Sequence, residues 1–499
     1  MIFIQYNSKI YHVKTWLVTF FIVIFSFTFC KLYEITHIAM KLSNAKWFLI
    51  AATSFSLFTA CKKDKGDDQS GSTNTPGSNV SAADKVKDTT LLYARDAYLW
   101  YTHIPSTFNA RSYSDPNAIM NAIRQYSKES GFTDPVDKWS FAVDKKEWDN
   151  VSSGISGDFG LTVFFVQGTP DLRVAAVEQN SPAGKAGVKR GWRITKVNGT
   201  DVANASGSTL TNAIYYSSST AFTFQKPDNS TVNITLTAQQ YQENPIFLDA
   251  IYTTNSGKLG YIVFNSFLGD TTAIYNEFNR IFTNFSNSGV TDVAIDLRYN
   301  GGGYVAMQQK LANYLIKPSA DGQLMMKQEF NNKLSQYNSS TLFKKLGTFN
   351  PNRVFFIVGR NTASASELLI NNMKPYMNVS VVGSDKTYGK PVGYFPIPVG
   401  SWYTLPVSFR STNKEGKGNY FGGIELNHKG EDGLAYDWGN ENEGLLASVL
   451  RFMNTGSFGR MAGQASDVNE AAKQRSDKLN ESLIEHRFKG MIDTRGLKK

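Results

Sequence analysis

The chain has 499 residues, of which 41% are hydrophobic and 13% are aromatic. Because a single hydrophobic core stops growing at about 250 to 300 residues, this length predicts several domains. The net charge of +10 comes from 52 Lys and Arg against 42 Asp and Glu. These charges are interspersed and form no arginine-rich tract, which argues against a nucleic-acid-binding protein. The two cysteines, Cys30 and Cys61, lie in or beside hydrophobic N-terminal segments, which excludes a disulfide framework and a CxxC metal site.

Residues 40–61 have the order of a bacterial signal peptide. Lys41 and Lys46 form the charged end, an apolar run follows, and the segment ends in Phe-Thr-Ala-Cys at Cys61. This tetrapeptide resembles a lipobox, whose cysteine is acylated and becomes the new N-terminus. The polar residues 62–83 are expected to form a flexible tether. We predict lipidation at Cys61 and anchoring in the cell envelope, facing the periplasm or the cell surface; the alternative is a buried cysteine in a short core helix.

Residues 1–39 contain a further apolar run, at residues 16–30. We interpret this segment as an over-long start, with Met40 as the initiator. An extra hydrophobic segment that anchors the chain in a membrane is the alternative, although about 15 residues are short for a span.

The region of residues 84–150 is expected to be a small helical domain. Leu91, Leu92, Tyr98 and Leu99 fall on one face of a helix, and the region is rich in aromatic residues. After it, residues 151–242 change to short β runs that are broken by glycines, which predicts a β-rich domain with short helices.

A recognisable pattern lies within this β-rich region, at residues 181–199. Ser-Pro-Ala opens a short helix, Gly191 precedes an expected strand over 192–197, and Asn198-Gly199 is a hairpin turn. This order resembles the signature of PDZ domains, which bind an extended peptide as an added strand; an ordinary glycine-bearing hairpin is the alternative. The resemblance implies a loop that captures the peptide's C-terminal carboxylate, formed by Phe159, Gly160, Leu161 and Thr162.

The third region, residues 245–452, alternates apolar strands with helical patterns and is expected to be an α/β core. The remaining residues, 453–499, are polar and charged, which predicts an exposed helix or a disordered end. The expected fold is therefore a multidomain α+β protein.

Three short motifs in the third region suggest chemistry. Residues 296–303, Asp-Leu-Arg-Tyr-Asn-Gly-Gly-Gly, end a strand in glycines whose N–H groups can converge on a phosphate or an oxyanion. Tyr304 follows instead of Gly-Lys-Ser/Thr, which disfavours a phosphate loop. Ser364 precedes a helix and is either a nucleophile or an N-cap, with Glu367 completing a capping box. Lys390, between glycine turns, is either solvated or a desolvated general base.

In this order, and after a PDZ-like segment, the three motifs resemble the C-terminal processing, or tail-specific, peptidases of the Ser/Lys type. The resemblance covers about residues 84–452, and it includes residues 137–141, Asp-Lys-Trp-Ser-Phe, before the PDZ-like segment. It implies a crotonase-like α/β peptidase core. It also implies a role for each site residue: Ser364 as nucleophile, Lys390 as general base, Glu367 as the carboxylate that orients the lysine, and the N–H groups of Ala365 and of Gly302 or Gly303 as the oxyanion hole. Many members have glutamine four positions after the lysine, where this chain has Tyr394, so the third catalytic group stays undefined.

Other catalytic arrangements are not supported by the sequence. None of the histidines has a catalytic context, and neither HExxH nor GxSxG occurs. Residues 411–414 match SxxK but lack its partner motifs. We therefore predict a PDZ-gated serine peptidase that acts on proteins or peptides outside the cytoplasm, without a metal or organic cofactor. A non-catalytic PDZ scaffold with a degenerate peptidase core and a carbohydrate- or lipid-binding surface lipoprotein are the alternatives.

Overall fold

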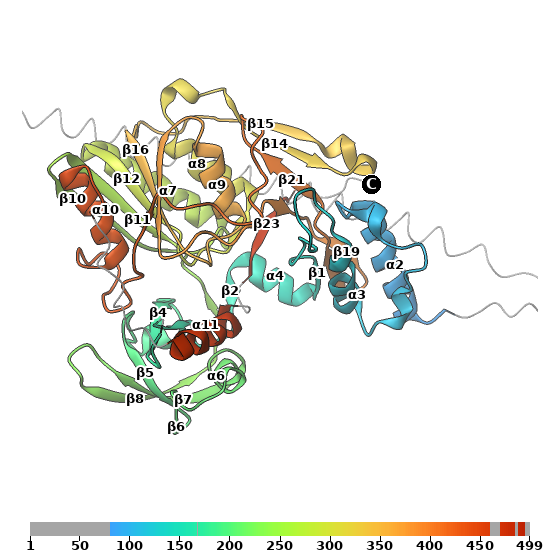
Figure 1. Ribbon diagram of the computed structural model, residues 1–499, viewed down its shortest axis with the longest axis horizontal. Coiled ribbons are helices and arrows are strands. Elements are labelled where there is room, and N and C mark those ends of the chain that lie inside the picture. Colours follow the sequence, from blue (N-terminus) through green and yellow to red (C-terminus); the bar gives the residue numbers. More distant parts are fainter. Residues whose placement is uncertain (1–79, 167, 460–469, 485–487, 495–499) are drawn as a thin grey trace, which may run out of the picture. The chain divides into compact units, whose positions relative to one another are not determined.

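The computed structural model describes residues 80–166, 168–459, 470–484 and 488–494 (Figure 1). The chain divides into two compact units, Met1–Ser78 and Asn79–Lys499, and the described residues all belong to the second. The predictions for residues 1–39 and 40–61, lipidation of Cys61 included, lie outside the described residues, as does most of the tether 62–83. Within the described ranges, no helix is both long and apolar enough to cross a membrane.

The N-terminal region contains the helices α2 (Ala82–Ala97), α3 (Pro116–Ile123) and α4 (Lys145–Ser153). Ser81 and Asp115 cap α2 and α3, each accepting a hydrogen bond from an N–H of the first turn. The region also has a strand, β1 (Phe141–Asp144), which pairs with β20 (Trp402–Leu405) next to β19 (Ile397–Val399). The apolar faces of these helices share one core with late residues such as Leu405, so this region packs together with part of the third region.

The β-rich region is an antiparallel sheet of six strands. Its order is β3-β4-β5-β7-β8, with β6 paired to β5, so that β3 lies at the edge. The strands are β3 (Leu161–Phe165), β4 (Leu172–Val177), β5 (Arg193–Val197), β6 (Thr200–Asp201), β7 (Ser219–Gln225) and β8 (Thr231–Thr237); the short helices are α5 (Pro182–Lys185) and α6 (Gly207–Thr211), and β2 (Ile155–Ser156) pairs with β9 (Tyr241–Gln242). Asn198 and Gly199 both have positive φ, as a type I′ hairpin between β5 and β6 requires.

The third region has a six-stranded sheet with helices on both faces. Its order is β10 (Ile246–Thr254), β11 (Gly257–Phe264), β12 (Val290–Asp296), β16 (Arg353–Val358), β17 (Asn378–Gly383) and β22 (His428–Lys429). All neighbouring pairs are parallel except β10 and β11, as expected for an α/β core. The helices are α7 (Thr271–Asn287), α8 (Val305–Leu315), α9 (Ala365–Met373) and α10 (Gly444–Thr455).

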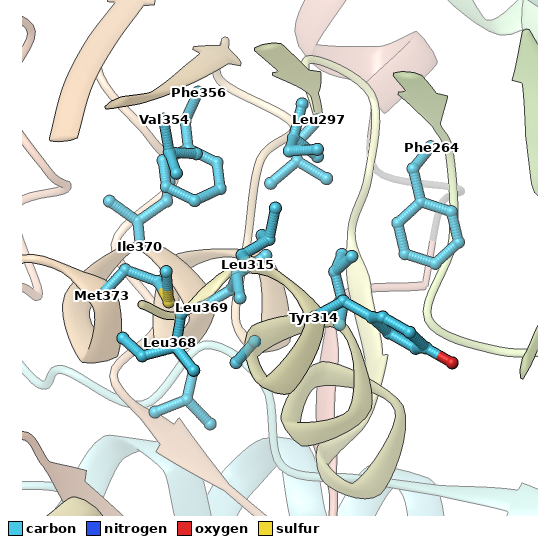
Figure 2. Packing of buried hydrophobic residues seen from close by; sticks show 14 of the residues in the cluster. Phe264, Leu297, Tyr314, Leu315, Val354, Phe356, Leu368, Leu369, Ile370 and Met373 are labelled. Carbon is cyan, nitrogen blue, oxygen red and sulfur yellow. The ribbon is translucent and has the colours of Figure 1, made fainter. Parts of the chain in front are cut away.

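Alternate side chains of the central strands point to opposite faces of this sheet. Val354 and Phe356 of β16 pack with the apolar residues of α7, α8 and α9, whereas Phe355 and Ile357 pack with those of α10. Figure 2 shows the first of these cores, where Ile370 of α9 approaches Val354 and Phe356. Burying each such side chain contributes about 1.5–3 kcal/mol, so α9 is anchored firmly beneath the sheet.

A second sheet and the chain's last segment complete the structure. The second sheet has the order β15 (Ser339–Leu342), β14 (Leu324–Phe330), β21 (Phe409–Thr412), β18 (Val392–Gly393). Beyond α10 lie the helix α11 (Glu470–Ile484) and the strand β23 (Gly490–Ile492), which pairs in parallel with β13 (Gly302–Tyr304). The expectation of an exposed or disordered end was wrong for this strand, because Met491 and Ile492 are fully buried in the apolar cores.

Candidate active site

Ser364 lies in the turn that joins β16 to α9. Its φ of +61° and ψ of −108° place a non-glycine residue in a region that costs about 1–3 kcal/mol. The side chain is fully buried, and its Oγ has no hydrogen-bond partner among the described residues. A buried hydroxyl without a partner costs roughly a further 1–3 kcal/mol. The turn therefore holds a buried hydroxyl group in a strained and unsatisfied state at the start of a helix.

The Glu367 carboxylate connects this turn to the lysine loop. Its Oε2 accepts hydrogen bonds from the backbone N–H of Ser364, at 2.7 Å, and of Lys390, at 2.8 Å. Its Oε1 accepts from Thr387 Oγ1, at 2.6 Å, and from Gly389 N, at 2.7 Å. Burial raises the pKa of Glu367, and these donors oppose that shift. Glu367 thus occupies the capping-box position that the sequence suggested, with its carboxylate bonded to Ser364 N. The serine hydroxyl has no hydrogen-bond partner among the described residues and is therefore available.

Lys390 is completely buried. Its Nζ lies 3.9 Å from the ring centroid of Tyr394 and 5.7 Å from that of Trp139. Burial lowers the pKa of Lys390 well below 10.5; Arg124 and Lys489 add to this shift, while Asp137 and Glu367 oppose it. Burial therefore favours the neutral form of this amine, which is the form that a general base requires.

The glycine turn lies directly beside the start of α9. A Cβ on Gly302, whose φ is +102°, would lie 2.9 Å from Ala365 N, so this approach requires glycine. The N–H of Gly302 itself donates to Asn300 Oδ1, at 2.9 Å. Of the two alternatives left open by the sequence, this favours Gly303, together with Ala365, as the pair of oxyanion donors. Ala365 is the first residue of α9, where a helix leaves its N–H groups without intrahelical partners.

Two further residues complete the surroundings of Lys390, and the sequence did not assign them roles. Asp137 is buried and accepts hydrogen bonds from Tyr98 Oη, Trp139 N, Ser140 N and Ser140 Oγ. Tyr394, which stands where many relatives are expected to have glutamine, covers the lysine with its ring and donates from its hydroxyl to Lys489 O, at 3.0 Å. The Asp-Lys-Trp-Ser-Phe segment contained the signal for Asp137 and Trp139, but sequence alone did not place it beside Lys390.

A cavity of about 1100 Å³ opens beside Trp139 and Tyr394. Aromatic side chains, among them Trp139, Tyr388 and Tyr394, form part of its wall, and Arg124 and Lys386 add positive charge. This volume is enough for several residues of a peptide. Among the residues that the structure describes, no group of three His, Cys, Asp or Glu side chains could hold a metal ion.

The loop predicted to capture a peptide carboxylate lies at the start of β3. Phe159 and Thr162 are buried, and Gly160 has the expected positive φ of +75°. The N–H of Gly160, however, donates to Asp158 Oδ1, at 2.7 Å. Its expected role as a free donor is therefore wrong for this structure, because an internal carboxylate already occupies it.

Comparison with known proteins gives a consistent result. Residues 258–425 match the family model of peptidase family S41. Residues 86–141 match a second model, the peptidase S41 N-terminal domain. A probable CtpA-like serine protease of Staphylococcus aureus is 26% identical over 265 residues, covering 51% of this chain and 49% of the relative. That of Staphylococcus saprophyticus is 24% identical over 258 residues, covering 51% and 50%. The chain thus spans about half the length of the curated relatives it matches.

One solved structure has a similar fold over most of the described chain. It is a putative S41 protease from Bacteroides fragilis, with a TM-score of 0.60 and 23% sequence identity. The match covers 73% of this chain and 96% of the other.

Proposed function

The chain belongs to peptidase family S41, the C-terminal processing peptidases, and on this premise we propose that it cleaves proteins or peptides with Ser364 as nucleophile and Lys390 as general base. The observation that carries the proposal is the bonding of Glu367 to the backbones of both residues. A single buried carboxylate thereby fixes a strained serine with an unpartnered hydroxyl and a desolvated lysine relative to each other.

The mechanism follows from the state of each group. Neutral Lys390 takes the proton from Ser364 Oγ, which attacks the peptide carbonyl carbon. The N–H groups of Ala365 and Gly303 stabilise the oxyanion of the tetrahedral intermediate. The protonated lysine then gives its proton to the leaving amine, and an acyl-enzyme remains. Lys390 next removes a proton from water, whose attack releases the acid and regenerates Ser364.

We assign the region of residues 151–242 as a PDZ domain that presents substrate to this site. Its edge strand, β3, has the position at which PDZ domains add a peptide strand. Because Asp158 occupies the N–H of Gly160, backbone pairing along β3 is a better supported mode of capture than carboxylate binding at that loop.

We also place the protein in the cell envelope, anchored by a lipid on Cys61. In a chain that begins at Met40, Cys61→Ser should move the protein from the membrane fraction to the soluble fraction and leave peptide cleavage intact. Retention of this variant in membranes would contradict the anchor.

A fluorophosphonate that reacts with activated serines tests the catalytic proposal most directly. We expect an adduct on Ser364, its loss in Ser364→Ala, and loss of peptide cleavage in the same variant. Ser366→Ala, in the first turn of α9, is the control for nonspecific labelling. A wild-type protein that is neither labelled nor able to cleave peptides at any pH would instead support the non-catalytic scaffold.

A further inference from the structure

The chain's own C-terminal segment lies in the candidate active site. The strand β23 pairs in parallel with β13, the strand of the glycine turn, so that Gly302 lies opposite Gly490. Gly490 N donates to Gly301 O, at 3.0 Å, and Tyr394 N donates to Met491 O, also at 3.0 Å. The segment is therefore held on both sides by backbone hydrogen bonds, as an extended peptide substrate would be.

Two carbonyl groups of this segment meet the catalytic groups themselves. Lys390 Nζ donates to Lys489 O, at 2.8 Å, and no hydrogen bond joins it to Ser364 Oγ among the described residues. The next carbonyl, Gly490 O, would lie 2.3 Å from a Cβ added to Gly302, and Ala365 N would lie 2.9 Å from the same Cβ, so this carbonyl lies beside the expected oxyanion donors. The segment thus fills the position of a substrate backbone while it diverts the base from the nucleophile.

Apolar side chains also hold the segment in place. Met491 is 0% exposed and packs in the core with α8 and α9, and Ile492 is 1% exposed and packs with the N-terminal region. Side chains that are buried to this extent are part of the packed core of the protein.

The preceding helix, α11, packs against β3 and α6, and Figure 1 shows it beside the β-rich region. Asn480 uses its side-chain amide as an added strand would use its backbone: Oδ1 accepts from Phe165 N, at 2.8 Å, and Nδ2 donates to Phe165 O, at 3.0 Å. Leu479 and Leu483 of the same helix pack on the apolar core of the β-rich region. The same C-terminal segment therefore occupies both places at which the proposed peptidase would bind a peptide.

We propose that residues 470–484 and 488–494 are a built-in inhibitor, which leaves the active site when a substrate peptide displaces α11 from the edge of β3. The inference rests on the proposed function, because it assumes that Ser364 and Lys390 are the catalytic pair. It adds that the resting enzyme is closed by its own C-terminus, and that a peptide able to pair with β3 is an activator as well as a substrate.

The double variant Met491→Asp/Ile492→Asp tests this inference in the full chain. Two buried carboxylates should expel β23, and kcat/KM for a short peptide should rise by about tenfold or more, because the competent fraction increases. Phosphonate labelling of Ser364 should accelerate to a similar extent. Gln474→Asp, at an exposed position of α11, is the matched control and should change neither rate.

Asn480→Ala tests the same inference without placing a charge in a core. It removes both hydrogen bonds to Phe165, so we expect a smaller gain in labelling rate, and the synthetic peptide of residues 488–494 should reverse the gain of either variant. Unchanged labelling in both variants, with circular dichroism that shows them folded, would overturn the inhibitor.

A binding measurement separates this inference from the proposed function. A fluorescein-labelled peptide of residues 488–494 should bind to the Ser364→Ala form of the double variant, measured by anisotropy, and unlabelled peptide should compete. If Ser364 is never labelled but this peptide binds, the catalytic proposal fails while the segment's binding place stands. If Ser364 is labelled equally in all variants and the peptide does not bind, the inhibitor fails while the catalytic proposal stands.

Discussion

The backbone N–H of Ser364 donates a 2.7 Å hydrogen bond to Oε2 of Glu367. This bond holds the serine in its positive-φ conformation, and the same carboxylate oxygen holds the loop of Lys390. In the proposed mechanism, Glu367 therefore acts through the two residues that it positions, with no need to contact the substrate.

Glu367→Gln should separate this positioning role from a purely structural one. A carboxamide presents an NH₂ group to N–H donors, so about two of the four hydrogen bonds are lost, at a cost of roughly 1–3 kcal/mol in stability. We expect kcat to fall by about 10- to 100-fold with little change in KM, because substrate contacts stay intact. Steady-state kinetics and urea unfolding measure the two effects; Glu425→Gln, at an exposed position, is the control. A rise in KM alone would contradict the positioning role.

Lys390→Arg tests the identity of the base. Arginine keeps the positive charge but does not lose its proton in a protein, so it cannot accept the proton of Ser364. Because a positioned general base contributes about 10²- to 10⁴-fold, we expect a loss of that size in kcat/KM. Lys414→Arg, on the surface, should be unaffected. A loss of less than about tenfold would argue against Lys390 as the base.

The sequence proposed three residues of the site, which Glu367 connects in the structure, but it did not predict everything around them. Ser364, Glu367 and Lys390 were identified because each lies next to a strand-to-helix turn or a glycine turn, which are local signals. The pairing of β1 with β20 and the strand β23 were not predicted, because both depend on contacts between segments that are far apart along the chain. Met491 and Ile492 form too short an apolar run within a polar end to predict a buried strand.

The lowered pKa of Lys390 predicts how activity depends on pH. The base must be neutral, so kcat/KM should rise with pH through a midpoint well below 10.5 and then level off. The same shift affects stability: between the lowered pKa and 10.5 the unfolded chain binds more protons, so the free energy of unfolding rises with pH across that window. Burial also lowers the pKa of Lys345 and Lys374, so Lys390→Met should reduce this slope and stabilise the protein, measured by urea unfolding at several pH values. A slope equal to that of the wild type would assign it to the other lysines.

A buried charge cluster beside the glycine turn provides a prediction about stability. Arg298 Nη1 bonds to Glu443 Oε1, at 2.6 Å, and to Asp432 Oδ1, at 2.8 Å, and Arg190 of the β-rich region also bonds to Asp432, at 2.8 Å. Burial alone would raise the pKa of Asp432, but Arg298 and Arg190 outweigh it and lower that pKa to about 2. The pairing of Asp432 therefore stabilises the fold above pH 3.8, and this contribution is lost as the pH falls toward 2.

Glu443→Gln should show how much the cluster depends on full compensation of its charge. It leaves the two arginines with one carboxylate fewer in a site that excludes water, and breaking a buried pair in this way typically costs about 3–5 kcal/mol. Because Arg298 precedes the glycine turn by three residues, we also expect slower phosphonate labelling of Ser364 under conditions in which the variant is folded. Glu441→Gln, two residues away and exposed, changes the same charge and should cost less than about 0.5 kcal/mol. Equal unfolding free energies for the two variants, measured in urea at pH 7, would mean that solvent, and not Glu443, compensates the positive charge of the arginines.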